Sequence, residues 1–204
     1  MLFVRIFLSI LILILSFQSF AKADNIEDFM IEGISLGDSL LDHFSKSNIE
    51  KEIRSEFSYK YKNNRYVQLG IGQTNQFPLF RKLDKFDELG ITIKPNDENY
   101  VVQGLLGDIL CHNNIDKCML AKDEIINDLK ENFVGLVIDT WERKHPMDKT
   151  GQSIVYGNTL SSDNLDFSFS VSVYDMSDNN YNDSVQLSLR VKELENFIMY
   201  EAYN

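Results

Sequence analysis

The sequence predicts an α+β fold: an antiparallel sheet with a long helix packed on one face and short helices at both ends of the domain. Two runs near the C-terminal end, residues 165–173 and 185–191, alternate strictly between apolar and polar side chains, as strands with one buried face do. Residues 114–133 repeat apolar side chains at steps of three and four, which predicts a helix with one face in the core. Asn114 is expected to cap this helix, and Gly135 follows it as a stop signal. The pattern contains no tandem βαβ units, which favours antiparallel strands.

The N-terminal 23 residues have the pattern of an export signal. Arg5 precedes an apolar stretch over residues 6–17. Ala21-Lys22-Ala23 fits an A-x-A cleavage site, after which the mature chain would begin at Asp24. The alternative is an uncleaved anchor, because the apolar stretch approaches the length needed to span a bilayer. The mature protein is therefore expected in the periplasm or outside the cell.

A single α+β domain is expected over residues 24–204. Removing 23 of the 204 residues leaves 181, which suits one domain with a real core. The signal contains two basic residues and no acidic ones, so its removal changes the formal net charge from −11 to −13. An acidic surface repels phosphate groups, which disfavours nucleic acid and anionic lipid as partners and permits cationic ligands. No segment of the mature chain is apolar for long enough to span a membrane.

Two short helices are expected at the start of the domain. Ser35 or Asp38 can cap the first through a side-chain oxygen. Ser47 and Glu50 have the capping-box spacing, which predicts a second helix over residues 48–57. Strands are expected next, over residues 59–71, 91–94 and 100–110. The last two are expected to form a hairpin, with residues 100–110 as its buried strand.

The two cysteines of the chain flank the connection between the buried strand and the long helix. Cys111 ends the strand and Cys118 lies in the first turn of the helix, so a reversing connection brings them together. We predict a disulfide, for which the chain-entropy model gives about 2.5 kcal/mol of stabilisation. The alternative is a thiol nucleophile at Cys118, but the spacing is not C-x-x-C and no thioredoxin-like pattern surrounds it.

Residues 140–150 are rich in charged side chains and are predicted to form a loop. Trp141, the one tryptophan, precedes the local basic cluster Arg143-Lys144-His145. We expect a solvated loop tip with Trp141 folded inward; the alternative is a cluster that docks an anion. Further strands and a closing helix over residues 192–203 are expected to complete the domain.

Metal and cofactor sites are not predicted. Residues 175–183 hold six Asp and Asn side chains, whose oxygens suit calcium, but the EF-hand spacing is missing and tight turns use the same residues. Calcium binding by this loop is left open. His43, His112 and His145 are widely separated, and both cysteines are assigned to the disulfide, so a zinc site is disfavoured.

Gly37-Asp38-Ser39-Leu40 contains the four letters that name the GDSL hydrolases. In that family the serine ends a parallel strand and acts as nucleophile, so the resemblance implies that Ser39 attacks the substrate, with His112 or His145 as its base. The chain departs from the family elsewhere. The strand before the tetrad is interrupted by polar residues, and neither a G-x-N-D block nor a D-x-x-H near the C-terminus follows. We therefore reject the match and expect this segment to begin a helix.

From Tyr100 onward the chain resembles a group of uncharacterised exported proteins of marine alphaproteobacteria. The resemblance includes the buried strand, the Cys118 helix with Lys122-Asp123-Glu124-Ile125, the turn Asp148-Lys149-Thr150-Gly151 and the alternating strands, in the same order. It covers about half of the chain and implies an exported location and a shared fold. No functional residue is known for the group.

Two functions from different classes follow from the sequence. The first is an exported, non-catalytic domain that binds a protein or envelope component through its sheet edge or through the Trp141 segment. The second is a serine hydrolase that uses Ser39. The sequence assigns no ligand-binding residue, no partner and no oligomeric state.

Overall fold

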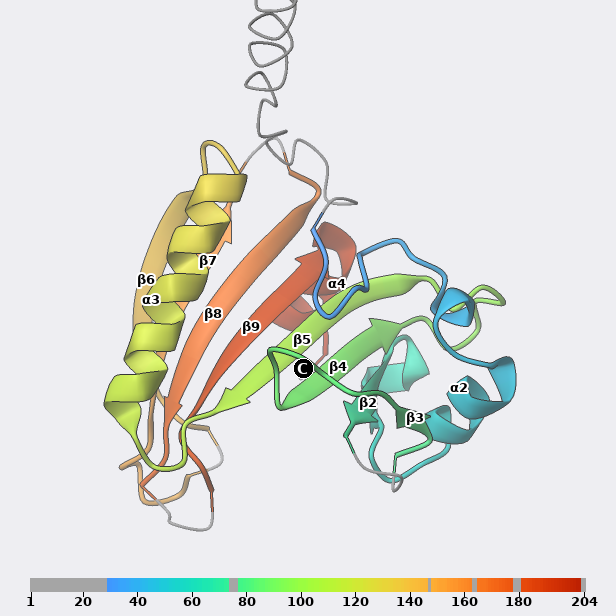
Figure 1. The fold of residues 1–204 in the computed structure, drawn as a ribbon, viewed down its shortest axis with the longest axis horizontal. Helices are drawn as coiled ribbons and strands as arrows, with labels where there is room; N and C mark the ends of the chain where they lie inside the picture. Colours follow the sequence, from blue (N-terminus) through green and yellow to red (C-terminus); the bar gives the residue numbers. More distant parts are fainter. Residues whose placement is uncertain (1–28, 74–76, 147, 163–164, 178–180, 203–204) are drawn as a thin grey trace, which may run out of the picture.

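One large sheet dominates the part of the chain that the structure, a computed structural model, describes (Figure 1). The described residues are 29–73, 77–146, 148–162, 165–177 and 181–202, so the predicted signal peptide lies outside them. Within them, nine strands form one sheet in the order β1-β2-β4-β5-β9-β8-β7-β6, and β3 pairs with β2. The strands are β1 (Tyr59–Lys60), β2 (Val67–Gly72), β3 (Leu79–Phe80), β4 (Glu88–Ile93), β5 (Val102–Leu110), β6 (Val137–Lys144), β7 (Ile154–Ser161), β8 (Phe167–Asp175) and β9 (Ser184–Val191). All pairs are antiparallel except the short β2–β3 pair.

The predicted α+β class is wrong, because the described chain is mainly β-sheet. Its helical segments are η2 (Leu40–Asp42), α2 (Lys46–Ile53), η3 (Lys62–Asn64), α3 (Ile115–Asn132) and α4 (Lys192–Tyr200). Among these, only α3, with 18 residues, is long. No helix in the described ranges is long and apolar enough to cross a membrane.

The first part of the charged stretch predicted as a loop, residues 140–144, belongs to strand β6 at one edge of the sheet. Apart from Val137 and Ile138, its six side chains are polar or aromatic, and six of its eight residues are exposed. An edge strand buries neither face fully, so it lacks the apolar alternation by which the other strands were predicted. Trp141 therefore lies within a strand and not at a loop tip.

Helix α3 packs on one face of the sheet, against β8 and β9 (Figure 1). Its first turn is capped by Asn114, whose side-chain oxygen accepts a hydrogen bond from the Lys117 amide at 3.1 Å. Gly135, just beyond the helix, has a φ of +77°, a conformation that glycine adopts without a Cβ clash. At the end of the helix, the ring of Phe133 lies 5.0 Å from that of Phe169. Helix α3 thus covers one face of the sheet at β8 and β9.

Helix α2 begins earlier than predicted and carries a buried carboxyl group. Ser45, not Ser47, caps it by accepting a hydrogen bond from the Asn48 amide at 3.3 Å. Glu52 is fully buried, and its Oε1 accepts a hydrogen bond from the Gly70 amide at 3.3 Å. Burial raises the pKa of Glu52 above its ordinary value. This helix therefore holds β2 partly through a polar contact inside the protein.

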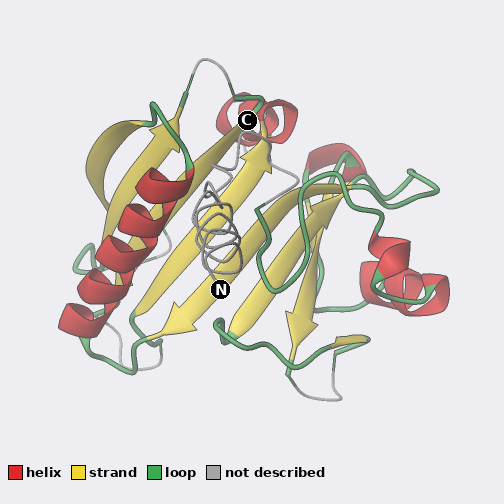
Figure 2. Ribbon diagram, turned by 45° about the horizontal axis from the view of Figure 1, so that its top comes forward, coloured by secondary structure: helices red, strands yellow, loops and turns green. Residues whose placement is uncertain are grey.

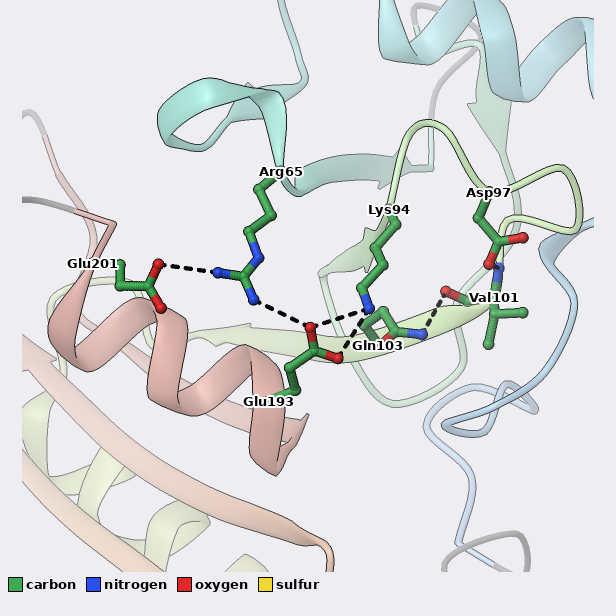
Figure 3. A network of polar contacts seen from close by, with 7 residues as sticks. All are labelled: Arg65, Lys94, Asp97, Val101, Gln103, Glu193 and Glu201. Carbon is green, nitrogen blue, oxygen red and sulfur yellow. Dashed lines mark hydrogen bonds and ion pairs between the residues drawn. The ribbon is translucent and has the colours of Figure 1, made fainter.

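Helix α4 covers part of the opposite face of the sheet, at the end where β9 finishes. A Cβ atom at Gly104 would lie 2.7 Å from Leu194, so the helix approaches the strand closely because position 104 is glycine. Phe197 packs against Tyr66, with ring centroids 5.1 Å apart. Outside this apolar contact, Glu193 binds Lys94 at 2.9 Å and Arg65 at 3.2 Å (Figure 3).

The two faces of the sheet are covered unequally, as Figure 2 also shows. Apolar side chains of β8 and β9, such as Phe169 and Leu189, belong to the core on the α3 side. Their neighbours on the other face are polar, among them Ser172, Gln186 and Ser188. Helix α4 covers one end of this polar face, and the start of β9 lies at the other end.

Candidate functional site

A cavity of about 730 Å³ opens at the end of the polar face that α4 leaves uncovered. It is formed by the start of β4, the end of β5, the end of β8, the start of β9 and the β6–β7 connection. Its lining mixes aromatic, polar and charged side chains: Glu88, Leu110, His145, Asp148, Lys149, Ser153, Tyr174, Met176, Tyr181, Asn182, Ser184 and Gln186. Cavities of this size with a few placed polar groups are typical binding sites.

Strand register brings three polar side chains into contact beside this cavity. Asp108 of β5 pairs with Gln186 of β9, so their side chains leave the sheet on the same face. Gln186 Nε2 donates a hydrogen bond to Asp108 Oδ1 at 3.0 Å. The Tyr174 hydroxyl donates to Gln186 Oε1 at 3.3 Å. Tyr174, Gln186 and Asp108 therefore form a polar chain that runs across three strands.

Within this hydrogen-bonded chain, Asp108 is the residue whose pKa departs strongly from its ordinary value. Burial of its carboxyl raises its pKa to about 6, and the negative charge of Glu88 adds to the increase, while the hydrogen bond from Gln186 opposes it. Glu88 lies directly opposite Asp108 on the neighbouring strand β4. Like charges in directly opposite positions repel each other, so this arrangement favours a proton or another cation between the two strands.

Asp148, on the other side of the cavity, has a structural role. Its side chain accepts hydrogen bonds from the amides of Thr150 at 2.8 Å and Ser153 at 2.7 Å. It also accepts a hydrogen bond from the Thr150 hydroxyl at 2.7 Å. These donors hold the pKa of Asp148 well below its ordinary value. The carboxylate thus fixes the β6–β7 connection.

His145 contributes an aromatic wall to the cavity. Its ring centroid lies 5.8 Å from that of Tyr174, in an edge-to-face arrangement. Its backbone amide donates to the Ser153 carbonyl at 2.9 Å, which continues the β6–β7 pairing by one residue. Its Nδ1 is buried, and no hydrogen-bond partner for it lies in the described part of the chain.

Ser39, the nucleophile that the GDSL resemblance implies, caps a short helix. Its hydroxyl donates to the Asn99 carbonyl at 2.8 Å and accepts a hydrogen bond from the Leu41 amide at 3.3 Å. Ser39 pairs with Val101, and the sheet beside it is antiparallel. No hydrogen bond among the described residues joins Ser39 to an imidazole. The nearby His43 is instead 3.3 Å from Asp38.

Cys111 and Cys118 are joined as a disulfide, with their Cα atoms 5.7 Å apart. Both side chains are buried, and neither cysteine is free. The bond links the end of β5 to the first turn of α3 across the turn that holds His112 and Asn113, both of which have positive φ. The disulfide therefore gives both cysteines a structural role.

The acidic loop of residues 175–183 is only partly described, because residues 178–180 lie outside the described ranges. Asp183 uses Oδ1 to accept a hydrogen bond from the Met176 amide at 2.9 Å. Burial, with the charge of Asp183, raises the pKa of Asp175. Across the residues that are described, no group of three or more His, Cys, Asp or Glu side chains is placed to hold a metal ion.

Sequence reasoning missed Asp108, Gln186 and Tyr174. The available signal was Asp108 itself, a charged residue among the apolar side chains of a strand predicted to be buried. Gln186 and Tyr174 gave no signal, because a polar residue is ordinary on the wet face of an alternating strand.

Comparison of the chain with protein-family models, with curated proteins and with solved structures finds no match. The resemblance to exported alphaproteobacterial proteins stays an expectation. Any function for the cavity therefore rests on its own geometry and charge.

Proposed function

We propose that this protein is an exported, non-catalytic binding domain whose cavity receives a cationic side chain of a protein or envelope component. One observation carries the proposal: Asp108, a half-buried aspartate, lies directly opposite Glu88 beside the cavity. Their repulsion and the burial of Asp108 both disfavour two ionised carboxylates. A cation bound between them offsets these costs, because both carboxylates attract it.

The rest of the lining supports a lysine or arginine side chain as the bound group. Such side chains have an apolar stem and a charged end. The rings of Tyr174 and His145 offer apolar surface for the stem, and an aromatic face attracts a cation. Lys149 is the one lysine of the lining and adjoins Asp148, so we expect the cation at the strand side, near Glu88.

The net charge of the chain supports the same class of partner. A formal charge of −11, or −13 after the predicted cleavage, attracts basic partners over long range and speeds their encounter with the acidic surface. The partner remains defined by its chemistry: a protein or envelope component that presents an exposed amine or guanidinium group.

Export rests on the N-terminal sequence and on the disulfide. Disulfides persist in oxidising compartments, and the bond between Cys111 and Cys118 fits such a location. The test is the mass of the protein recovered from the periplasm and the medium of an expressing cell. We expect a chain that begins at Asp24, and an uncleaved chain in the membrane fraction would support the anchor instead.

Binding is tested by following backbone amide signals in NMR spectra of the purified protein during titration with a capped Gly-Lys-Gly peptide. Gly-Glu-Gly serves as the control peptide. We expect the lysine peptide to shift the amides of Leu110, Ser184 and Gln186, which line the cavity. The control should shift none of them.

A matched pair of variants locates the bound charge. Glu88→Gln removes one negative charge at the cavity, and Glu98→Gln removes one at an exposed turn elsewhere. Loss of a charge-assisted contact weakens binding about tenfold, so we expect that loss for Glu88→Gln alone. Equal effects of the two variants, or equal binding of both peptides, would show that the cavity does not recognise a cation.

The hydrolase hypothesis is tested separately with a serine-reactive phosphonate. Because the Ser39 hydroxyl is engaged as donor to a carbonyl and as acceptor from an amide, we expect no labelling. Stoichiometric labelling of Ser39, located by mass spectrometry, would favour the hydrolase over the binding domain.

A further inference from the structure

Strand β6 forms an edge of the sheet with one side unpaired by any strand in the described ranges. It pairs with β7 over its full length, from Val137 opposite Ser161 to Lys144 opposite Ile154. An eight-residue edge of this kind presents a row of backbone donors and acceptors to another strand. The question is which strand these groups fit.

One hydrogen bond fixes which backbone groups face outward. The His145 amide donates to the Ser153 carbonyl at 2.9 Å, and this pair continues the β6–β7 register. Backbone groups of alternate residues in a strand point to opposite sides. The odd-numbered residues of β6 therefore point their amides and carbonyls at β7. The even-numbered residues, from Ile138 to Lys144, point theirs at the free edge.

We propose that β6 pairs antiparallel with β6 of a second copy of this chain about a two-fold axis, so that two sheets join into one. In such a pair, hydrogen-bonded positions must both be outward-facing, so even-numbered residues pair with even-numbered ones. Of the registers that meet this condition, one places Thr140 opposite Glu142 of the second copy. In that register Asp139 lies opposite Arg143, and two-fold symmetry makes this contact twice.

Charge complementarity selects this register over its neighbours. A shift of two residues in one direction places Glu142 opposite its own copy, where like charges repel. The opposite shift leaves Asp139 facing Trp141 and Arg143 facing Val137, which loses both ion pairs. The charges of β6 disfavour pairing with an arbitrary strand. They complement the charges of a second β6 in one alignment.

The largest side chain of β6 leaves the edge accessible. The Trp141 ring lies over its own sheet, so close to Gly157 that a Cβ atom there would overlap it. Its Nε1 donates to Thr159 Oγ1 at 3.2 Å, and the Arg143 guanidinium lies 4.6 Å from the ring centroid. With the indole directed toward β7, the outward backbone groups of Thr140 and Glu142 remain open to a partner strand.

The experiment is sedimentation equilibrium on the purified protein at concentrations up to about 1 mM. We expect a concentration-dependent dimer. Glu142→Pro removes an outward-facing amide and no bond to β7, so it should raise the dissociation constant at least about tenfold. Glu142→Thr, which keeps the amide and removes the same charge, is the matched control and should change dimerisation far less.

Charge exchange tests the register without altering the backbone. Asp139→Arg and Arg143→Asp should each weaken the dimer, because each places like charges opposite one another. The double variant restores opposite charges and should recover the dimer. A monomer at all concentrations, including one that pairs only with a different protein, would overturn the proposal. So would a dimer that these variants leave unchanged.

Discussion

At the scale of single residues, Asp108 is a group beside the cavity whose ionised form is electrostatically unfavourable. It lies on a strand whose other face is packed in the core, and its carboxyl has one hydrogen-bond donor, Gln186, and a negative neighbour, Glu88. A proton or a cation stabilises this group, whereas water alone does so incompletely. The same group therefore affects both folding stability and binding.

Asp108→Asn should change how stability depends on pH. The native pKa of about 6 lies above the ordinary value of 3.8, so the folded protein holds this proton more tightly than the unfolded chain. The stabilisation is fully present below pH 4 and is lost as the pH rises through about 6, by up to about 3 kcal/mol.

Asp108→Asn leaves no ionisable group at position 108, so the variant should lack this pH-dependent loss of stability. Urea unfolding at pH 4 and pH 7 measures it, with Glu98→Gln as the control. If wild type and Asp108→Asn lose the same free energy of unfolding between these pH values, Asp108 titrates normally in the folded protein.

Gly157 is required by the packing of Trp141. A Cβ atom at this position would overlap the indole ring, so Gly157→Ala should displace it and destabilise the protein by about 1–3 kcal/mol. Trp141 is the one tryptophan in the chain, so its fluorescence should shift to longer wavelength. Ser161→Ala, at the exposed end of the same strand, should leave the emission unchanged. Unchanged emission from both variants would mean that the ring does not pack on Gly157.

At the scale of the elements, α4 is held by an apolar contact and by an ionic contact, and the two contribute unequally to the stability of the fold. Phe197 is buried against Tyr66, whereas Glu193 and both of its partners, Lys94 and Arg65, are substantially exposed. Exposed ion pairs contribute little because water and salt screen them.

Phe197→Ala should therefore cost about 3–5 kcal/mol and Glu193→Gln less than about 1 kcal/mol. Both values come from chemical denaturation at one ionic strength. A larger loss for Glu193→Gln than for Phe197→Ala would contradict the assignment of α4 stability to the apolar contact.

The disulfide ties β5 to α3, which packs on β8 and β9. Replacing both Cys111 and Cys118 by Ser should lower the free energy of unfolding by about 2.5 kcal/mol, because the unfolded chain regains the freedom of the closed loop. Reduction of the wild type should produce a similar loss. If neither treatment changes the midpoint of denaturation, the bond does not stabilise the fold.

At the scale of the whole molecule, sequence periodicity predicted local elements well and the fold class badly. The alternating runs that became β8 and β9 each bury one face, and α3 carries the cap and stop residues that were expected. Strand β6 left no such pattern, because its charged side chains are exposed at an edge. Among the described residues, sheet outweighs helix even when β6 and the short strands β1 and β3 are left out.

The candidate site was not predictable in the same way. Asp108, Glu88 and Gln186 belong to three strands, and only the register between those strands places them together. A single sequence without strand pairing does not specify register, so an isolated charged residue in a buried strand was the one available indication. The Ser39 tetrad had the opposite property: a recognisable local motif whose surroundings assign it to a helix cap.

The most direct test of the binding proposal is a carbon-13 NMR titration of the Asp108 carboxyl, without and with saturating Gly-Lys-Gly peptide. Without peptide we expect a pKa of about 6. A bound cation favours the ionised carboxylate, so the peptide should lower this pKa while Gly-Glu-Gly leaves it unchanged. A pKa near the ordinary value of aspartate in the free protein, or one that the lysine peptide does not lower, would contradict a cation site between β4 and β5.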